Sequence, residues 1–246
     1  MDLIQALAAE LGKDPRHVEN VVHLLDEGNT IPFIARYRKE LHGAMDDTSL
    51  RTLEERLQYL RGLEERREAV KKSIDEQGKL TDELAAAIDS AKTLAEVEDL
   101  YRPYKQKRRT RATMAKEKGL EPLAALLFAQ ERDCPRPEEA ARNFVDPEQG
   151  VETVEDALQG ASDIIAEQIS DDAAIRKSLR ALISRQGQLV SRAATEDDSV
   201  YRLYYDFTQS VARLQGHQVL AINRGEKEGI LKVTVALDRE QALPLL

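Results

Sequence analysis

One long run of regularly spaced leucines constrains the fold of this chain more than any other feature. Between residues 48 and 77, large aliphatic residues recur three, four or seven positions apart. This spacing predicts a single long spine helix with one apolar face. The apolar seam consists of Leu50, Leu53, Leu57, Leu60, Leu63, Val70 and Ile74. Opposite charges four residues apart are expected to pair on the other faces, as Arg51–Glu55, Arg61–Glu65 and Glu68–Lys72.

The chain as a whole is rich in good helix formers, which predicts a mostly α-helical and elongated region. Helices are expected around residues 121–130, 153–169 and 171–186, with Ser170 as the cap between the last two. The expected organisation has four parts. They are a helix-turn-helix-like N-terminal unit (1–47), the spine helix (48–77), a helical bundle (78–190) and a connector with a short strand (191–246).

The first two helices have the spacing of a helix-turn-helix. Ala8, Gly12 and Val18 stand where a small residue, a turn glycine and a buried aliphatic residue are needed. The second helix with its cap carries one arginine against four acids. Because Asp14 and Glu19 would repel phosphates, a packing hairpin is favoured over base readout, and sequence-specific repressor-like binding is disfavoured.

The C-terminal part changes character. Aliphatic residues alternate with polar or small ones over 231–237, which predicts a β-strand. A lone strand leaves backbone groups unpaired, so either residues 189–192 pair with it or its partners belong to another domain. The residues 243–246 contain no stop signal, and we expect the chain to be the front part of a longer protein.

Composition excludes several functional classes. The 246 residues carry a net charge of −9, so the surface as a whole does not attract polyanions. No apolar run reaches the roughly 18 residues of a membrane span, and the N-terminus lacks a basic leader. The single Cys134 permits no internal disulfide. These features predict a cytoplasmic protein without membrane contact.

The sequence lacks the motifs of common enzyme and metal sites. GxxxxGK[ST], GxGxxG, HExxH and GxSxG are all missing, and the four histidines form no compact ligand set. Adjacent carboxylates fall where caps and turns are expected, at Asp46-Asp47, Asp171-Asp172 and Asp197-Asp198. We therefore expect a non-enzymatic chain with no catalytic residue, no metal and no cofactor.

A basic segment within the predicted bundle is the main candidate for a binding site. Residues 102–111 contain six cations and no acid, and Tyr101 and Tyr104 flank the start. One interpretation is that the cations bind phosphates while the tyrosines stack on unpaired bases. The other is that the segment is a solvated loop, or that it pairs with acidic residues such as 96–99. The candidate nucleic-acid-binding residues are Arg102, Tyr104, Lys105, Lys107, Arg108, Arg109 and Arg111; secondary candidates are Arg36, Arg38 and Lys39.

Several strings resemble the Tex family of bacterial transcription accessory proteins. They are TIPFIARYRKE (30–40), LEERLQYLRGLEERREA (53–69), EQGKLT (76–81), DLYRPYKQKRRTRATMAKEKGLEPLA (99–124) and LAINRGEKEG (220–229). The resemblance implies an N-terminal region followed by a YqgF-type RNase-H-like domain, helix-hairpin-helix elements and an OB-fold. It also implies that nucleic-acid binding in the family resides mainly in that OB-fold, and it suggests a link to RNA polymerase.

Two functions remain open from the sequence. The first is a helical scaffold of a transcription accessory protein whose basic segment contacts RNA or DNA without sequence preference. The second is a protein-interaction module that docks onto RNA polymerase or onto downstream domains of the same protein. High helix content and overall acidity fit both.

Overall fold

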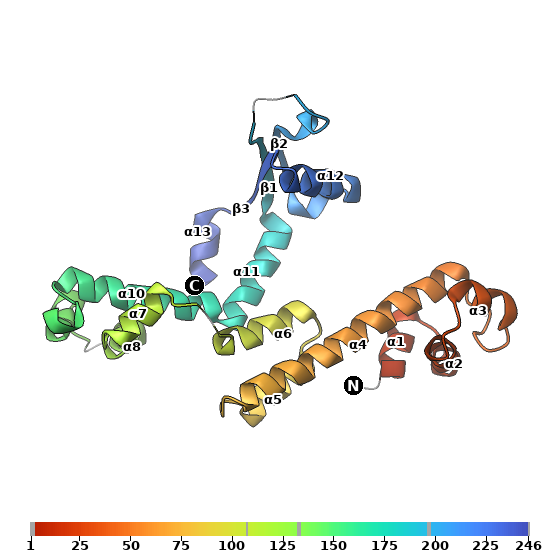
Figure 1. The fold of residues 1–246 in the computed structure, drawn as a ribbon, viewed down its shortest axis with the longest axis horizontal. Helices are drawn as coiled ribbons and strands as arrows, with labels where there is room; N and C mark the ends of the chain where they lie inside the picture. Colours follow the sequence, from red (N-terminus) through yellow and green to blue (C-terminus); the bar gives the residue numbers. More distant parts are fainter. Residues whose placement is uncertain (1–2, 107, 132–133, 196–197, 246) are drawn as a thin grey trace. The chain divides into compact units, whose positions relative to one another are not determined.

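The computed structural model describes residues 3–106, 108–131, 134–195 and 198–245 (Figure 1). The chain divides into two compact units, Met1–Glu98 and Asp99–Leu246. Most of the described residues are helical, and a small antiparallel sheet lies toward the C-terminus. The predicted fold class, mostly α with a short β element, is confirmed.

The first unit is built from helices that begin and end at residues with clear capping roles. Gly12 ends the first helix with φ +61°, and Asp14 caps the second, with its carboxylate accepting from the Arg16 amide at 2.9 Å. Ala8 and Val18 are buried in this hairpin. The elements are α1 (Leu3–Leu11), α2 (Pro15–Asp26), α3 (Ile31–Tyr37), α4 (Asp47–Asp75), α5 (Asp82–Ser90) and the start of α6 (Leu94–Tyr101).

The predicted spine helix is α4, and all seven residues of the apolar seam are buried. The expected charge pairs along it are wrong. Arg51 pairs with Asp47, Arg61 reaches Asp26 on α2, and Glu68 pairs with Lys71 instead of a residue four away. Arg61 was expected to stabilise its own helix, but it fastens α4 to a neighbouring helix.

Two ion pairs on α4 make the first unit sensitive to acid. Arg56 donates twice to Glu10 and Arg61 donates twice to Asp26, and these hydrogen bonds hold the pKa of both carboxyls below their ordinary values. Their contribution is therefore complete above the ordinary carboxyl pKa and is lost as pH falls through the lowered pKa. Because the groups are more than a third exposed, each pair contributes at most about 1 kcal/mol.

We expect the double variant Arg56→Gln/Arg61→Gln to be less stable than the wild type near neutral pH, and we expect this difference to shrink as the pH falls below the ordinary carboxyl pKa. The measurement is urea unfolding followed by circular dichroism across this range. Arg51→Gln, which removes a pair within one helix, is the control and should keep the wild-type pH dependence. Parallel pH curves for the wild type and the double variant would contradict the assignment.

The second unit begins with helices and ends with the sheet. Its elements are α7 (Arg111–Glu117), α8 (Glu121–Ala129), α9 (Pro137–Ala141), α10 (Val154–Asp171), α11 (Ala173–Gln186), β1 (Gln188–Ala193), β2 (Asp206–Ser210), α12 (Gly216–Lys227), β3 (Leu231–Ala236) and α13 (Arg239–Ala242). Two sequence expectations need correction here. A helix occurs at α7, where none was expected, and Asp172 caps α11 in place of Ser170 because α10 continues through Asp171.

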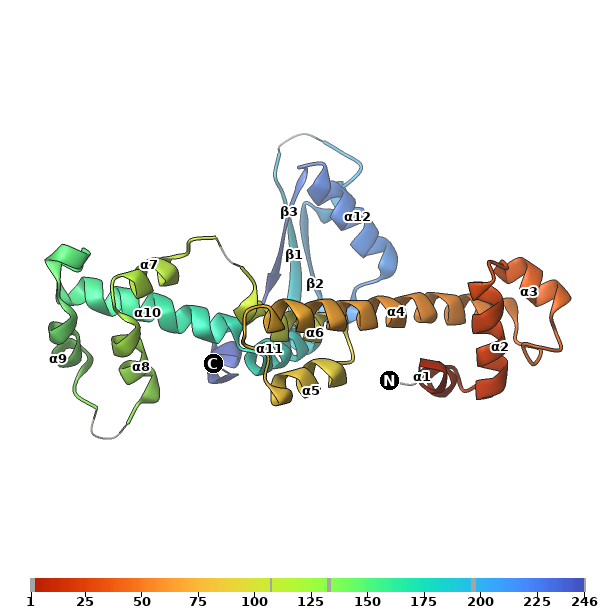
Figure 2. The same cartoon turned by 60° about the horizontal axis from the view of Figure 1, so that its bottom comes forward.

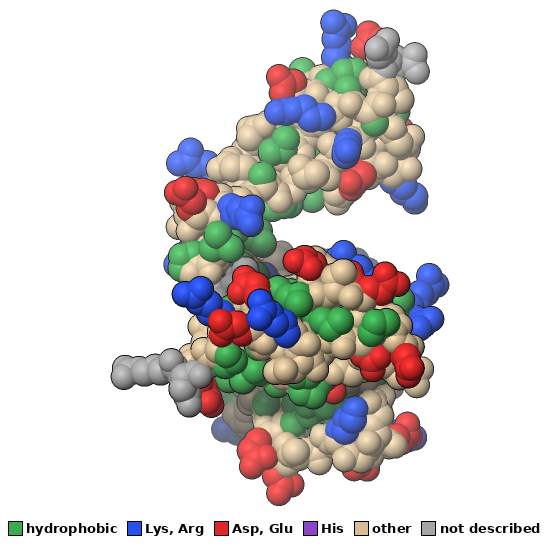
Figure 3. All heavy atoms as spheres, turned by 90° about the vertical axis from the view of Figure 1, so that its left-hand side faces the viewer, with side chains coloured by type: hydrophobic (Ala, Val, Ile, Leu, Met, Phe, Trp, Pro, Cys, Tyr) green, Lys and Arg blue, Asp and Glu red, His purple; other side chains and the backbone are tan. Residues whose placement is uncertain are grey.

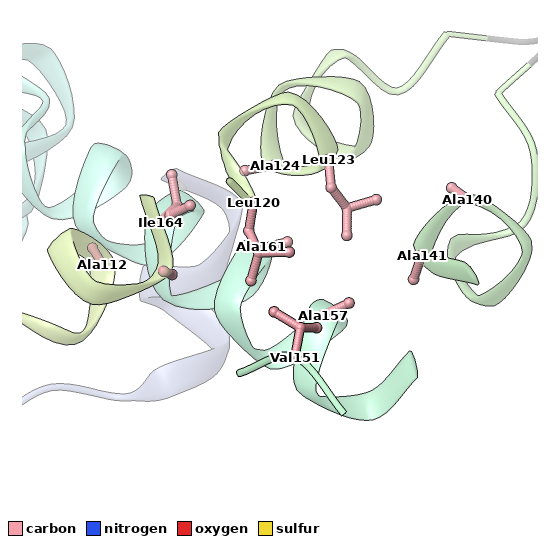
Figure 4. Packing of buried hydrophobic residues seen from close by; sticks show 11 residues of the cluster. Ala112, Leu120, Leu123, Ala124, Ala140, Ala141, Val151, Ala157, Ala161 and Ile164 are labelled. Atoms are coloured by element: carbon pink, nitrogen blue, oxygen red, sulfur yellow. The ribbon is translucent and has the colours of Figure 1, made fainter. Parts of the chain in front are cut away.

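The core of the helical part lies between α10 and helices α7–α9. Figure 4 shows Leu120 and Leu123 pointing toward Ala157 and Ala161 of α10. Small residues on α10 let the helices approach closely, and a Cβ at Gly160 would overlap the Leu120 side chain. This packing fixes the position of α10 within the unit, and with it one face that carries acidic residues.

The sheet has the strand order β2-β1-β3, with both pairs antiparallel. Ser191 at its centre is fully buried and lies opposite Phe207 and Val233. Of the two partners considered for the predicted strand, the internal one is therefore confirmed; β2 was not expected. Figure 2 shows α12 alongside the sheet, and its Gly225 approaches Leu231 of β3.

Candidate nucleic-acid interface

The basic segment (residues 102–111) connects α6 to α7. It starts as a short 3-10 turn, Arg102–Tyr104, has no regular structure at residues 105–106 and 108–110, and ends where Arg111 begins α7. Thr110 caps α7, its hydroxyl accepting from the Thr113 amide at 3.0 Å. Lys107, one of the candidate residues, lies outside the described residues.

Both ends of the segment are fastened to one face of α10. Arg102 Nε lies 3.0 Å from Asp171 Oδ1, and Arg111 Nε lies 3.7 Å from Asp163 Oδ1. Between these ion pairs, the Thr110 hydroxyl donates to Glu167 Oε1 at 3.1 Å. The segment is therefore held at both ends by a single helix, through Arg102 at its start and through Thr110 and Arg111 at its end.

The acidic face of α10 follows from helical spacing. Asp163, Glu167 and Asp171 are four residues apart, so they lie above one another on one side of the helix. Thr153 and Asp156 form a capping box that starts α10, and the neighbouring face, with Ala157, Ala161 and Ile164, is buried in the core. A cavity of about 340 Å³ lies between the acidic face and the two ends of the basic segment.

The middle of the segment is exposed. Lys105, Arg108 and Arg109 all face solvent, and Lys105 Nζ lies 5.9 Å from the centre of the Tyr101 ring. Arg109 pairs with Glu117 at 2.6 Å, with 68% of the arginine side chain and 51% of the glutamate side chain exposed. An ion pair with this much exposure to water contributes little stabilising free energy. Arg109 therefore remains available to another anion.

The structure therefore separates the predicted site residues into two groups. Arg102 and Arg111 lie beside largely buried carboxylates of α10, although the Arg111 side chain is 79% exposed, and Tyr104 is half-buried. Lys105, Arg108 and Arg109 are exposed in the middle of the segment. The acidic row that fastens the segment was missed in the sequence, although its four-residue spacing is visible there. Figure 3 shows one face of the molecule, and on this face basic and acidic side chains are interspersed.

Two of the acidic residues that were considered as partners of the basic segment, Glu98 and Asp99, pair with arginines outside it. Asp99 accepts from Arg176 Nε at 2.7 Å and from Arg180 Nη2 at 2.6 Å. Glu98 pairs with Arg66. Asp99 therefore fastens α6 to α11 within the second unit.

The secondary candidates lie in the first unit. Arg36 is on α3, and Arg38 and Lys39 follow its last turn. Arg36 and Lys39 are exposed and Arg38 is half-buried. Two aromatic residues on the same helix, Phe33 and Tyr37, were not among the candidates.

Among the described residues, no group of three or more histidine, cysteine, aspartate or glutamate side chains is arranged to hold a metal ion. Within the same residues, no helix has the length and hydrophobicity needed to span a membrane.

Comparison with known proteins identifies the family. Residues 1–75 match the model of the Tex-like protein N-terminal domain, and residues 133–244 match the Tex central region-like model. The chain belongs to the Tex family. The basic segment lies between the two matched ranges, and α3 lies in the first.

Relatives of this Tex-family chain occur in bacteria and in animals. It is 48% identical over 237 residues to the uncharacterized protein YdcI of Bacillus subtilis, covering 95% of this chain and 33% of that protein. It is 42% identical over 240 residues to the transcriptional accessory protein Tex of Neisseria gonorrhoeae, covering 96% and 31%. It is 31% identical over 245 residues to the human S1 RNA-binding domain-containing protein 1, covering 95% and 24%. The chain spans about a third or less of the length of these relatives.

Proposed function

We propose that this chain is a non-enzymatic, cytoplasmic scaffold of a transcription accessory protein, and that its basic segment contacts the phosphate backbone of RNA or DNA. The contact has no sequence preference, because the segment offers cations and no groups positioned to read base edges. The observation that carries the proposal is the exposed middle of the segment, held between two fastened ends.

Fastening reduces the entropic cost of binding. A free loop loses conformational freedom when its side chains settle on phosphates, whereas this segment is already restrained by Asp163, Glu167 and Asp171 of α10. Asp171 and Asp163, which are only 12% and 16% exposed, are the partners of Arg102 and Arg111. Phosphate contact is assigned to Lys105, Arg108 and Arg109 because their side chains are exposed between the two fastened ends of the segment.

The relatives support a nucleic-acid context. One is named a transcriptional accessory protein, and the human relative is named for an S1 RNA-binding domain. Contact by this chain would be modest by itself, because three phosphate contacts supply far less than the 6–10 of a typical DNA-binding protein.

We expect the charge reversal Arg108→Glu/Arg109→Glu to weaken binding of a 20-nucleotide RNA or DNA by about tenfold or more at low salt, because it removes two contacts and adds two repulsive charges. Fluorescence anisotropy with a labelled oligonucleotide measures the effect.

The matched control is Arg136→Glu/Arg142→Glu, which makes the same change in net charge at two exposed arginines of the same unit. This control should bind nearly as well as the wild type. If both variants lost affinity equally, the effect would be due to net charge and not to the basic segment. If Arg108→Glu/Arg109→Glu kept the wild-type affinity, the proposal would be refuted.

A protein-interaction module is the second candidate, and one observation favours it. Leu203, Leu220 and Val235 in the C-terminal part of the second unit are 84%, 73% and 53% exposed. Exposed aliphatic residues of this kind mark docking surfaces when they are contiguous. Association of the chain with purified RNA polymerase that survives nuclease treatment and is lost in Leu220→Asp would favour this function.

A further inference from the structure

Two aromatic side chains lie next to each other on the surface of α3. Phe33 and Tyr37 are 36% and 56% exposed, and their ring centres are 5.2 Å apart with an angle of 47° between the planes. The sequence contains only one other aromatic residue before residue 99, Tyr59. Two of the three aromatic residues of this unit are thus placed at the surface, where they give up the stabilisation that burial would provide.

The fold does not need these rings to hold α3 in place. Ile31 and Ile34, on the other side of the helix, are 3% and 0% exposed and anchor it in the core. Phe33, Arg36 and Tyr37 share the outer side because they are three and four residues apart. Packing of the unit therefore leaves the outer side of α3 exposed to solvent. Figure 1 shows this helix at one end of the first unit.

The arginines around the rings differ from every other arginine of the unit. Six of the eight arginines in residues 3–98 have a carboxylate within 4.0 Å; Arg36 and Arg38 have none among the described residues. Instead, the Arg38 guanidinium lies 5.3 Å from the centre of the Phe33 ring, and that of Arg36 lies 6.0 Å from the Tyr37 ring. Lys39 adds a third cation without a described carboxylate partner.

We propose that this surface, formed by Phe33, Arg36, Tyr37, Arg38 and Lys39, binds single-stranded nucleic acid. Exposed rings stack on unpaired bases, and neighbouring guanidinium and ammonium groups neutralise the phosphates between them. Single strands combine flat rings and regularly spaced negative charges in one ligand. A duplex fits this surface less well, because the faces of its bases are covered by the helical stack. An acidic peptide also fits less well, because its charged residues carry no flat ring that could stack.

The proposal is independent of the basic segment. The segment belongs to the other compact unit and offers cations to phosphates, whereas the α3 surface adds recognition of unpaired bases. The two sites therefore predict different ligand preferences. Loss of the basic segment lowers affinity for any polyanion, and loss of the α3 rings removes the preference for strands that carry bases.

The test compares a 20-nucleotide oligothymidine with a strand of equal length built from abasic deoxyribose, which keeps the phosphates and lacks the bases. We expect the 246-residue chain to bind oligothymidine about tenfold more tightly than the abasic strand. In Phe33→Leu/Tyr37→Leu, which keeps apolar volume and removes the rings, this preference should disappear. Tyr37→Phe retains a ring and should keep it.

Two further variants make the outcomes distinguishable. Phe128→Leu removes a 53%-exposed aromatic side chain of α8 and should change nothing. Arg108→Glu/Arg109→Glu should weaken both strands equally and leave their ratio intact. Equal binding of the two strands by the wild type, or an unchanged ratio in Phe33→Leu/Tyr37→Leu, would overturn the proposal. A polyglutamate peptide that competes as strongly as oligothymidine would overturn it in favour of an acidic protein partner.

Discussion

Replacing Arg67 by alanine should destabilise the first unit by about 3 kcal/mol. The Arg67 side chain lies on the buried side of α4 and is only 2% exposed. Its Nη1 donates to Glu64 and its Nη2 to the backbone carbonyl of Ala91, both at 2.6 Å. Ala91 is the C-cap residue that follows α5, so one guanidinium joins α4 to the end of the next helix. Truncation leaves a cavity and a buried carbonyl without this donor.

Arg66→Ala is the matched control for Arg67. Arg66 is adjacent in sequence, but its side chain is 35% exposed and pairs with Glu98 at the surface, so its loss should cost less than about 1 kcal/mol. Urea unfolding monitored by circular dichroism gives both values. Hydrogen exchange of peptides from residues 47–91 shows whether the loss is confined to these helices. Equal stability of the two variants would show that the buried guanidinium does not hold α5.

Replacing Asp99 by alanine should destabilise the second unit by about 2 kcal/mol. Asp99 is 4% exposed, and each of its carboxylate oxygens accepts from one arginine of α11, Arg176 or Arg180. Without it, two arginines four residues apart face each other with no counter-ion between them. Both guanidinium groups are partly exposed, so water relieves part of the penalty and keeps the loss below that of a fully buried pair.

Glu98→Ala is the corresponding control, because Glu98 is 39% exposed and pairs with Arg66 at the surface. Asp99→Asn keeps one acceptor oxygen and should fall between the two. Thermal unfolding with hydrogen exchange of peptides from α11 measures the order of the three variants. If Asp99→Ala were as stable as Glu98→Ala, the carboxylate would not fasten α6 to α11.

Sequence patterns predicted the elements whose signals are local. The seam of α4 is visible because a long helix with one buried face repeats its leucines, and the strand at 231–236 is visible from its alternation. The helix α7 was missed because its buried residues, Ala112 and Ala115, carry little hydrophobic signal. The strand β2 has one large apolar residue, Phe207, and its extended form depends on pairing with β1.

Ion-pair partners were the least predictable feature. The expected pairs on α4 were local ones, but Arg56 and Arg61 reach 46 and 35 residues back along the chain, to Glu10 and Asp26. The basic segment was predicted from its composition, but Arg102 finds Asp171, 69 residues later. Such partners depend on which helices pack together. The spacing of residues along one sequence predicts pairs within a helix but does not predict pairs between helices. The predicted phosphate contacts stay a prediction.

The salt dependence of oligonucleotide binding tests most directly whether the basic segment contacts phosphates. With Lys105, Arg108 and Arg109 as the contacts, the logarithm of the association constant for duplex DNA should fall with the logarithm of salt concentration with a slope of about −2.7. In Arg108→Glu/Arg109→Glu the slope should shrink to about −0.9, and in Arg136→Glu/Arg142→Glu it should stay near the wild-type value. A wild-type chain that does not bind at low salt, or one whose slope survives the reversal of Arg108 and Arg109, would contradict the account.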